Sequence, residues 1–332
     1  MENSMIPYYP NTIKIELVQG CNLSCSFCGI NGIEPEHHFM TFTTYKKIID
    51  LCKATKRKFR FSFSLHGEPS LSPIFSDCLQ YLKKEIPHSY VQCFTNGITY
   101  FETKQYKLED IIPYVDDFVL DDYKLQWSVE SLYQFFKDNV DTSKFDVYIE
   151  LMQDGVPFYK PKNVKAHRVL LCPNIALQTK QGVKQRQLNT HCGTGGDPCK
   201  VPINRDKRCH IPFRQLAFRW DGKVALCCND YRGYYYVCDA TSPEIKTFAD
   251  VWLHPRFESA RKIIYYQGRH LHPCNKCNDK GNRLGLLPDP MGMMEMPKPT
   301  YEDYTIWKEA TSHGTLTGIR LRKWEEPECE KL

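Results

Sequence analysis

Three cysteines, Cys21, Cys25 and Cys28, lie within eight residues near the start of the chain. Their spacing is C-x3-C-x2-C, and they directly follow a run in which apolar and polar residues alternate. Three thiolates on one short loop can each bind one iron of a 4Fe-4S cubane, which leaves the fourth iron without a protein ligand. Because an open metal position is where a substrate or cofactor coordinates, the loop predicts a reactive cluster.

Two other interpretations of these cysteines are weaker. Zinc ribbons use C-x2-C pairs, so Cys25 and Cys28 would make half of a zinc site and Cys21 would be surplus. Structural thiols buried in a core have no reason to gather within eight residues, and Cys52, Cys78 and Cys93, on helix or strand patterns, are expected to be such core residues. Cluster binding is therefore the favoured interpretation.

The composition limits the class of protein. The 332 residues suffice for two domains, or for one large barrel with an appendage. The 44 Lys and Arg against 39 Asp and Glu give a formal charge of +5, too small by itself to indicate nucleic-acid binding. The 16 cysteines, the absence of a signal-like N-terminus and the absence of a run of 18 apolar residues predict a cytoplasmic protein with no membrane partner, whose thiols serve metal or redox chemistry.

Strand-like runs alternate with helical patterns over the first half of the chain. Strands are expected at residues 12–19, 58–65, 90–94, 117–120, 145–152 and 167–171, and helices at 45–52 (capped from 43–44), 73–86 and 126–139. This alternation is typical of parallel βαβ units, whose chemistry lies at the carboxyl ends of the strands. The cysteine loop and residues 66–69, 95–97 and 121–122 all fall at such ends.

The cysteine loop, with Phe27 directly before its third cysteine, resembles the signature of the radical SAM superfamily. The resemblance implies an α/β fold with a partial (βα)6 barrel, a 4Fe-4S cluster on the three cysteines, and S-adenosylmethionine (SAM) on the open iron. In that family one electron cleaves SAM to a 5'-deoxyadenosyl radical, which removes a hydrogen atom from the substrate. A flavodoxin- or ferredoxin-like reductant is then also implied.

Residues outside the cysteines are expected to hold SAM. The sequence HGEP at residues 66–69 resembles the GGEP motif of the family, with a histidine in place of the first glycine, and it assigns Gly67 and Glu68 to the SAM amino group. Asn96, in a Thr-Asn-Gly run, is a candidate contact to the ribose or methionine part, and Asp121 is a candidate for the ribose. An ordinary turn capped by Glu68, and a plain Asn-Gly turn, are the alternatives.

A net oxidation also releases a proton, which a carboxylate or histidine must accept. Asp122, His66 and His191 are unranked catalytic candidates for this step. Glu150, on the fifth expected strand, either points into the barrel or is a structural carboxylate.

A second set of cysteines lies in the C-terminal half: Cys209, Cys227, Cys274 and Cys277. The first two belong to a C-x12-G-x4-C pattern, and the last two form a C-x2-C pair. Strand-like runs at 213–220 and 223–228 are joined by Asp221-Gly222, a two-residue hairpin turn. A helix at 247–265 then returns the chain, so that four thiolates can bind all four irons of a second cluster.

This second pattern resembles the SPASM and twitch auxiliary domains of radical SAM enzymes. A full SPASM domain has two further closely spaced cysteines after the C-x2-C pair, and here none follows before Cys329, which implies the one-cluster twitch form. The expected division is a barrel, a connector, an auxiliary α+β domain and a C-terminal tail packed on the barrel, at residues 1–170, 171–207, 208–280 and 281–332.

Three alternatives stay open for the second set. Cys228 is an alternative ligand to Cys227, although the G-x4-C spacing favours Cys227. Cys192, Cys199 and Cys238 are candidates for part of a further cluster. A structural zinc site also suits four cysteines on a hairpin and a knuckle.

The resemblance favours an enzyme that oxidises or rearranges a small molecule, with the auxiliary 4Fe-4S cluster as electron acceptor. Peptide modification is an alternative, weakened because Cys21 lies too near the start for a preceding leader-binding domain. Modification of a nucleotide or nucleic-acid base is another, suggested by the basic residues between 160 and 186. A zinc-binding interaction module is the alternative from outside the enzymes.

Overall fold

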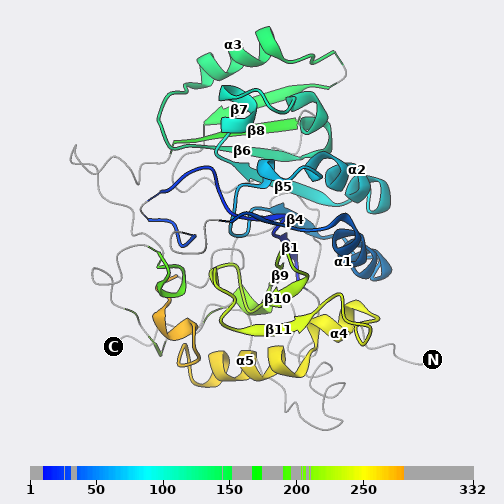
Figure 1. Cartoon of the computed structure of the whole chain (residues 1–332), viewed down its shortest axis with the longest axis vertical. Helices are drawn as coiled ribbons and strands as arrows, with labels where there is room; N and C mark the ends of the chain where they lie inside the picture. Colours follow the sequence, from blue (N-terminus) through cyan, green and yellow to red (C-terminus); the bar gives the residue numbers. More distant parts are fainter. Residues whose placement is uncertain are drawn as a thin grey trace.

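The computed structural model describes residues 10–25, 27–30, 36–143, 145–151, 167–173, 190–195, 203, 205–206, 209 and 211–279. One nine-stranded sheet runs along the molecule in the order β11-β10-β9-β1-β4-β5-β6-β8-β7 (Figure 1). All neighbours from β9 to β7 are parallel, whereas β9, β10 and β11 are joined antiparallel. The open, mainly parallel sheet agrees with the predicted α/β class and a partial barrel.

The strands of this sheet are β1 (Thr12–Ile15), β4 (Arg60–Phe63), β5 (Tyr90–Thr95), β6 (Asp117–Asp122), β7 (Val147–Leu151), β8 (His167–Pro173), β9 (Gln215–Phe218), β10 (Lys223–Ala225) and β11 (Tyr236–Asp239). Two short strands, β2 (Val18–Gln19) and β3 (His38–Phe39), pair with each other. The α-helices are α1 (Phe42–Ala54), α2 (Phe75–Glu85), α3 (Val129–Asn139), α4 (Phe248–Trp252) and α5 (Pro255–Tyr266). Short turns of helix include η1 (Pro69–Leu71), η6 (His191–Gly193) and η8 (Cys274–Lys276).

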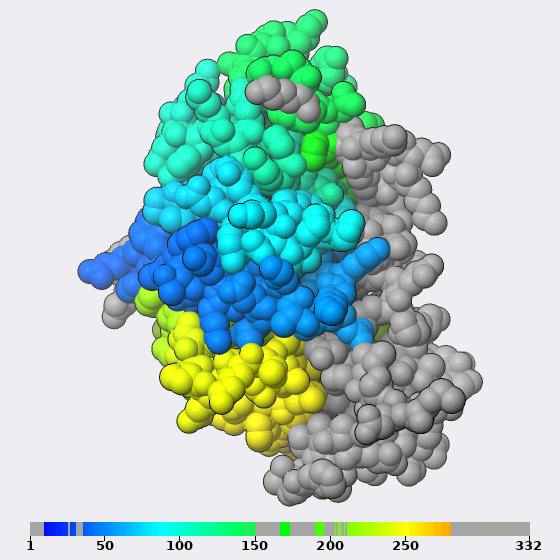
Figure 2. All heavy atoms as spheres, turned by 90° about the vertical axis from the view of Figure 1, so that its right-hand side faces the viewer, coloured from blue at the N-terminus to red at the C-terminus, as the bar shows by residue number. Residues whose placement is uncertain are grey.

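Successive side chains along a strand point to opposite faces of the sheet. Ile13, Phe61 and Phe118 lie in the hydrophobic core, into which the buried residues of α1 and α2 also pack. The other face carries most of the polar strand residues together with a few apolar ones such as Val119, and on it Asp117 forms a buried ion pair with Arg168 at 2.7 Å. The second face is therefore the polar interior of the partial barrel. Figure 2 shows α1, α2 and the segment around α4 forming one continuous outer face.

Several boundaries differ from the sequence predictions. The strand expected at 12–19 is divided into β1 and β2, because the chain leaves the sheet at Glu16 and then pairs with β3. Helix α1 begins at Phe42 and is capped by Thr41, whose Oγ1 accepts from the Thr44 amide at 3.1 Å. The helix expected at 247–265 is two helices, because Pro255, lacking an amide hydrogen, begins α5 and cannot continue α4.

Two features of the sheet were not predicted. Strand β9 pairs with β1 in parallel, so the C-terminal hairpin extends the barrel sheet instead of forming a separate one. The strand predicted at 167–171 is confirmed as β8, but its position between β6 and β7 was not predicted. Within the described residues, none of the helices combines the length and apolar character needed to cross a membrane.

Candidate functional site

The three N-terminal cysteines converge on one loop after β2, and each is partly exposed. Burial raises the pKa of Cys21 to about 12, and the negative charges of Glu68, Cys28 and Cys25 add to the shift. Thiols this close to one another become thiolates together only when a cation offsets their charge. The three donors therefore fit a cluster in which three irons each take one thiolate and the fourth iron is left open.

A glycine holds the HGEP turn against this loop. The Glu68 amide donates to the Gly20 carbonyl at 2.9 Å. A Cβ on Gly67 would lie 2.3 Å from the Val18 carbonyl oxygen and 2.5 Å from that of Gly20. Because both obstacles are backbone atoms, only glycine fits, and this requirement fixes the turn beside the cysteines.

Glu68 is a buried hydrogen-bond acceptor. Its Oε1 accepts from the Ser70 amide at 3.1 Å and from the Ser70 and Thr95 hydroxyls, each at 2.6 Å. Its Oε2 accepts from the Asn96 amide at 2.8 Å. Burial raises the pKa of this carboxyl. Glu68 thus joins η1 to the end of β5.

Asn96 extends this connection to the cysteine loop. Its Nδ2 donates to Asn22 Oδ1 at 2.7 Å and to the sulfur of Cys21 at 3.6 Å. The Phe27 ring lies 6.0 Å from that of Tyr123. Gly67, Glu68 and Asn96 are therefore gathered around the cysteine loop, and their contacts with SAM, like that of Phe27, stay predictions.

The two aspartates at the end of β6 have different surroundings. Asp122 is buried and accepts from the Gln126 amide at 3.3 Å and from the Trp127 amide at 2.9 Å, which anchors the approach to α3. Asp121 is the neighbouring residue on β6, so its side chain points to the opposite face of the sheet from that of Asp122. Its charge contributes to the raised pKa of Cys25, after burial and Cys28. Asp121, and not Asp122, therefore faces the cysteine loop.

Asp121 has a partner that the sequence did not indicate. Its side chain hydrogen-bonds with Cys172 at the end of β8, and burial followed by this contact raises the pKa of the Cys172 thiol to about 12. The side chain of Glu150 lies outside the described residues. The sequence carries no local signal for Cys172, because its position opposite Asp121 comes from the pairing of β8 with β6.

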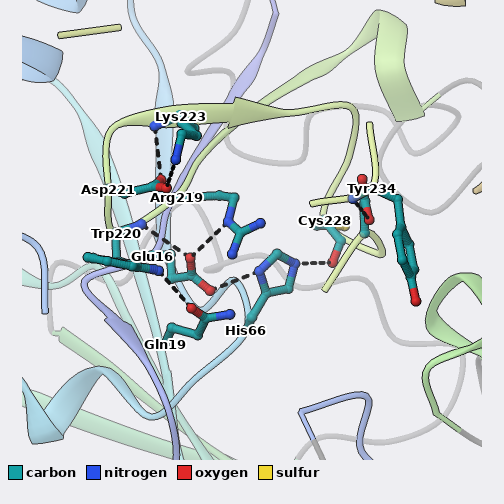
Figure 3. A network of polar contacts seen from close by, with 10 residues as sticks. Glu16, Gln19, His66, Arg219, Trp220, Asp221, Lys223, Cys228 and Tyr234 are labelled. Atoms are coloured by element: carbon teal, nitrogen blue, oxygen red, sulfur yellow. Dashed lines mark hydrogen bonds and ion pairs between the residues drawn. The ribbon is translucent and has the colours of Figure 1, made fainter. Parts of the chain in front are cut away.

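His66 lies buried between the two halves of the chain, as Figure 3 shows. Its Nδ1 is 2.9 Å from Glu16 Oε1, and its Nε2 is 3.2 Å from the backbone carbonyl oxygen of Cys228. Both partners present oxygen acceptors. The histidine that replaces the first glycine of the motif thus links β1 to the segment after β10, an arrangement that favours a positioning role over proton transfer from a substrate.

Glu16 extends this buried network into the hairpin (Figure 3). Its Oε2 accepts from the Trp220 amide at 3.1 Å and lies 3.8 Å from Arg219 Nε. Trp220 Nε1 donates to Gln19 Oε1 at 2.7 Å, and the Trp220 ring stacks on His38. The hairpin of β9 and β10 is therefore fastened to the strands that carry the cysteine loop.

The four predicted auxiliary cysteines are all buried: Cys209, Cys227, Cys274 and Cys277. The negative charges of Cys227, Cys209 and Cys277 raise the pKa of Cys274 further after burial, so these four thiols share one site. The positive charge of the Arg269 guanidinium lowers the pKa of Cys274 and so opposes these effects. This arrangement of four thiols beside a cation fits a second cluster.

The other cysteines separate into different surroundings. Cys192 belongs to the auxiliary site, because its thiol hydrogen-bonds to Cys227 and Cys277. Burial raises the pKa of the Cys228 thiol, the Lys14 ammonium lowers it and the negative charge of neighbouring Cys227 raises it, so the choice between Cys227 and Cys228 as ligand stays a prediction. Asp239 and Arg256 are the charged neighbours that affect Cys238, and Cys199 lies outside the described residues. Cys52, Cys78 and Cys93 are confirmed as core residues.

In the part of the chain that the structure describes, no group of three or more His, Cys, Asp or Glu side chains is arranged to hold a single metal ion. A cubane differs from one zinc ion because its four ligands bind four separate irons at the corners of the cluster.

Tyr231 lies between the two cysteine sites. Its side chain hydrogen-bonds with Cys28, and its ring centroid is 4.4 Å from that of His66 and 4.5 Å from that of His191. The turn that carries His191 also packs on the cysteine loop. A Cβ on Gly195 in this turn would lie 2.7 Å from the Phe27 carbonyl oxygen, so the two backbones touch directly.

Comparisons with known proteins agree with this arrangement. The model of the radical SAM superfamily matches residues 15–154, which include the first three cysteines and the HGEP turn. The model of the SPASM iron–sulfur cluster-binding domain matches residues 209–278, which include the four auxiliary cysteines. A comparison with curated protein sequences found no match.

Two solved structures of BtrN share the fold at low sequence identity, and a structure of anSMEcpe is less similar. The structure of BtrN in complex with AdoMet and 2-DOIA has a TM-score of 0.59 at 17% identity and covers 82% of this chain and 95% of BtrN. BtrN in an open conformation has a TM-score of 0.52 at 16% identity, with 82% and 93% covered. The structure of anSMEcpe with bound AdoMet has a TM-score of 0.46 at 12% identity, with 91% and 93% covered.

The two family matches together take in more than half of the chain and all seven predicted cluster ligands. They assign SAM and a 4Fe-4S cluster to the N-terminal part and an auxiliary iron–sulfur cluster to the C-terminal part. The chain therefore belongs to the radical SAM superfamily, as an iron–sulfur enzyme with a SPASM-type auxiliary domain.

Proposed function

We propose that this enzyme oxidises an alcohol or amine carbon of a small molecule, with the auxiliary cluster as the acceptor of the substrate's electron. The observation that carries the proposal is the contact between the two cysteine sites through Tyr231 and the turn at 190–195. An electron acceptor that lies against the radical-generating loop suits a reaction that removes electrons. BtrN, which shares the fold, was solved with 2-DOIA, and this supports a small molecule as substrate.

When bound, the reduced N-terminal cluster and SAM supply one-electron cleavage of SAM and removal of a hydrogen atom from the substrate. The residues of this chain provide the positions. Asn96 contacts Cys21, and Glu68 fixes the turn beside it, so both are assigned to the SAM side of the site. Asp121 lies at the carboxyl end of β6, on the face nearest to Cys25.

Oxidation of an alcohol or amine carbon releases one hydrogen atom, one proton and one electron. Asp121 is the side chain best placed to accept the proton, because its carboxylate faces the cysteine loop and already hydrogen-bonds with the Cys172 thiol. Asp122 and His66 are occupied by structural hydrogen bonds. His191 lies beside Tyr231, between the two sites, and is the second candidate.

The other candidate functions have less support. The family matches favour iron–sulfur chemistry over a zinc-binding interaction module. The basic residues that suggested a nucleotide or nucleic acid lie mostly outside the described residues. The oxidative outcome in the proposal therefore rests on the proximity of the two sites, and the small-molecule substrate rests on the likeness to BtrN.

The test compares Asp121→Asn with Asp138→Asn, an exposed carboxylate on α3 that hydrogen-bonds Gln134. Anaerobically reconstituted enzyme is supplied with polyols and amino-sugars deuterated at each candidate carbon. Deuterium is expected in 5'-deoxyadenosine, with one oxidised product per SAM cleaved. Asp121→Asn should slow product formation about 100-fold while SAM cleavage continues, and Asp138→Asn should behave as the unaltered enzyme. Redox-neutral products, or full oxidation by Asp121→Asn, would contradict the assignments.

A further inference from the structure

Among the residues that the structure describes, five thiols gather at the auxiliary site, although a four-iron cluster needs four ligands. Cys209, Cys227, Cys274 and Cys277 are the cysteines of the C-x12-G-x4-C and C-x2-C patterns. The fifth is Cys192, which lies before the segment matched by the SPASM model. Cys192 is 1% exposed, so it is as buried as the ligands themselves.

The position of Cys192 differs from that of a fifth ligand. Its thiol hydrogen-bonds to the sulfurs of both Cys227 and Cys277. The ligands of a cubane bind at separate corners, one per iron. A thiol within hydrogen-bond reach of two ligand sulfurs lies between two corners, where its S–H can donate to a ligand sulfur.

The turn that carries Cys192 is fixed to the C-x2-C knuckle. Thr190 Oγ1 donates to the Lys276 carbonyl at 2.8 Å, and the Thr190 amide donates to Asn278 Oδ1 at 2.7 Å. The backbone of Cys192 has a φ of 57° and a ψ of 31°, in the left-handed region that a non-glycine residue rarely adopts. Such a conformation persists only where surrounding contacts impose it, and here it directs the thiol toward Cys277.

The opposite side of the same turn reaches the N-terminal site. His191 contacts the ring of Tyr231, and Gly195 contacts the backbone of the cysteine loop at Phe27. Figure 1 shows the turn (green), the knuckle (orange) and the cysteine loop (blue) on the side of the sheet away from α1 and α2. The turn that carries Cys192 thus contacts both cysteine sites.

We propose that Cys192 is not a ligand of the auxiliary cluster but a positioning thiol that donates its one S–H hydrogen bond to a ligand sulfur, that of Cys227 or Cys277, and so raises the reduction potential of the cluster. A hydrogen bond to a ligand sulfur stabilises the reduced cluster, which carries one more negative charge. A higher potential makes the cluster a better electron acceptor, and in this respect the inference deepens the proposed oxidation and rests on it. The potential itself is a property of the enzyme without substrate.

The test uses the full chain, reconstituted anaerobically, with Cys192→Ala, Cys192→Ser and the control Cys238→Ala, which removes a buried thiol on β11. Iron and sulfide are counted, and the midpoint potential of the auxiliary cluster is measured by EPR during a redox titration. A variant with alanine at Cys21, Cys25 and Cys28 identifies which signal belongs to that cluster.

Cys192→Ala should keep the full iron content and shift the midpoint potential downward. Cys192→Ser should bring the midpoint potential most of the way back to that of the unaltered protein, because a hydroxyl also donates. Cys238→Ala should change neither the iron content nor the midpoint potential. Loss of half of the iron in both Cys192 variants would overturn the proposal by making Cys192 a ligand. An unchanged potential in Cys192→Ala would also overturn it. Because no substrate is present, these outcomes are independent of whether the enzyme oxidises small molecules.

Discussion

Tyr231, which follows the β9–β10 hairpin, hydrogen-bonds with Cys28 of the N-terminal cysteine loop. Burial, followed by the negative charges of Cys28 and Cys228, raises the pKa of the Tyr231 hydroxyl, so this group stays protonated and acts as the donor. One side chain from the auxiliary half of the chain thereby acts directly on a sulfur of the radical-generating site.

Replacing Tyr231 with Phe should therefore alter the N-terminal cluster while leaving its iron in place. Loss of the donor makes the reduced cluster less stable, so its midpoint potential should fall. Loss of one hydrogen bond costs about 1 kcal/mol in the free energy of unfolding. Both quantities are measured by EPR titration and urea unfolding. Tyr234→Phe, at an exposed residue, is the control, and equal behaviour of the two variants would exclude the contact.

The pair of His66 and Glu16 should show strong coupling in a double-mutant cycle. His66→Gly restores the glycine of the family motif but leaves the buried Glu16 carboxylate without its imidazole partner. Breaking a buried pair in this way costs roughly 3 kcal/mol or more. Adding Glu16→Gln to His66→Gly should cost less than Glu16→Gln costs in the unaltered chain, because the imidazole contact is already gone and only the contacts with Arg219 and the Trp220 amide are changed. Additive unfolding free energies in urea would show that the two side chains act independently.

The stability of the auxiliary half should depend on pH through Glu258. Burial raises the pKa of this carboxyl in the folded chain, despite its 2.6 Å ion pair with Arg261 on the same helix. A raised folded pKa means a stabilising contribution that is complete below the ordinary value of 4.5 and is lost as the pH rises through the folded value.

The measurement compares the unaltered chain with Glu258→Gln by urea unfolding between pH 4 and about 8, since Gln does not titrate. The difference in unfolding free energy, unaltered minus variant, should decrease as the pH rises through this window. A difference that increases with pH would show that the ion pair with Arg261 outweighs burial and that the folded pKa is lowered.

Metal content should divide between the two cysteine sets. Anaerobically reconstituted protein is expected to be brown and to hold about eight irons per chain. Alanine at Cys21, Cys25 and Cys28 should remove about half of the iron and all SAM cleavage. Alanine at Cys274 and Cys277 should remove the other half but leave SAM cleavage measurable. A colourless protein that binds zinc would refute both assignments.

Local spacing was enough to predict most of the proposed cluster ligands. The intervals within C-x3-C-x2-C and C-x2-C place thiols on single short loops whatever the rest of the chain does, so the sequence alone predicts them. Gly67 was predicted from the likeness of HGEP to the family motif, whereas the physical reason for a glycine there is a tertiary contact with the backbone of residues 18–20. The alternation of apolar residues likewise predicted the parallel strands from β1 to β8, because period two is a property of each strand by itself.

Tertiary structure decided the remaining assignments. Neighbouring residues on a strand face opposite sides, so the sequence could not choose between Asp121 and Asp122 until the pairing of β6 with β8 fixed which face is the interior. Cys192 joins a site whose other members lie up to 85 residues away in the chain, between Cys192 and Cys277, and no local interval encodes that contact. The position of His66 between Glu16 and Cys228 likewise exists only because β9 pairs with β1 and closes the hairpin onto the cysteine loop.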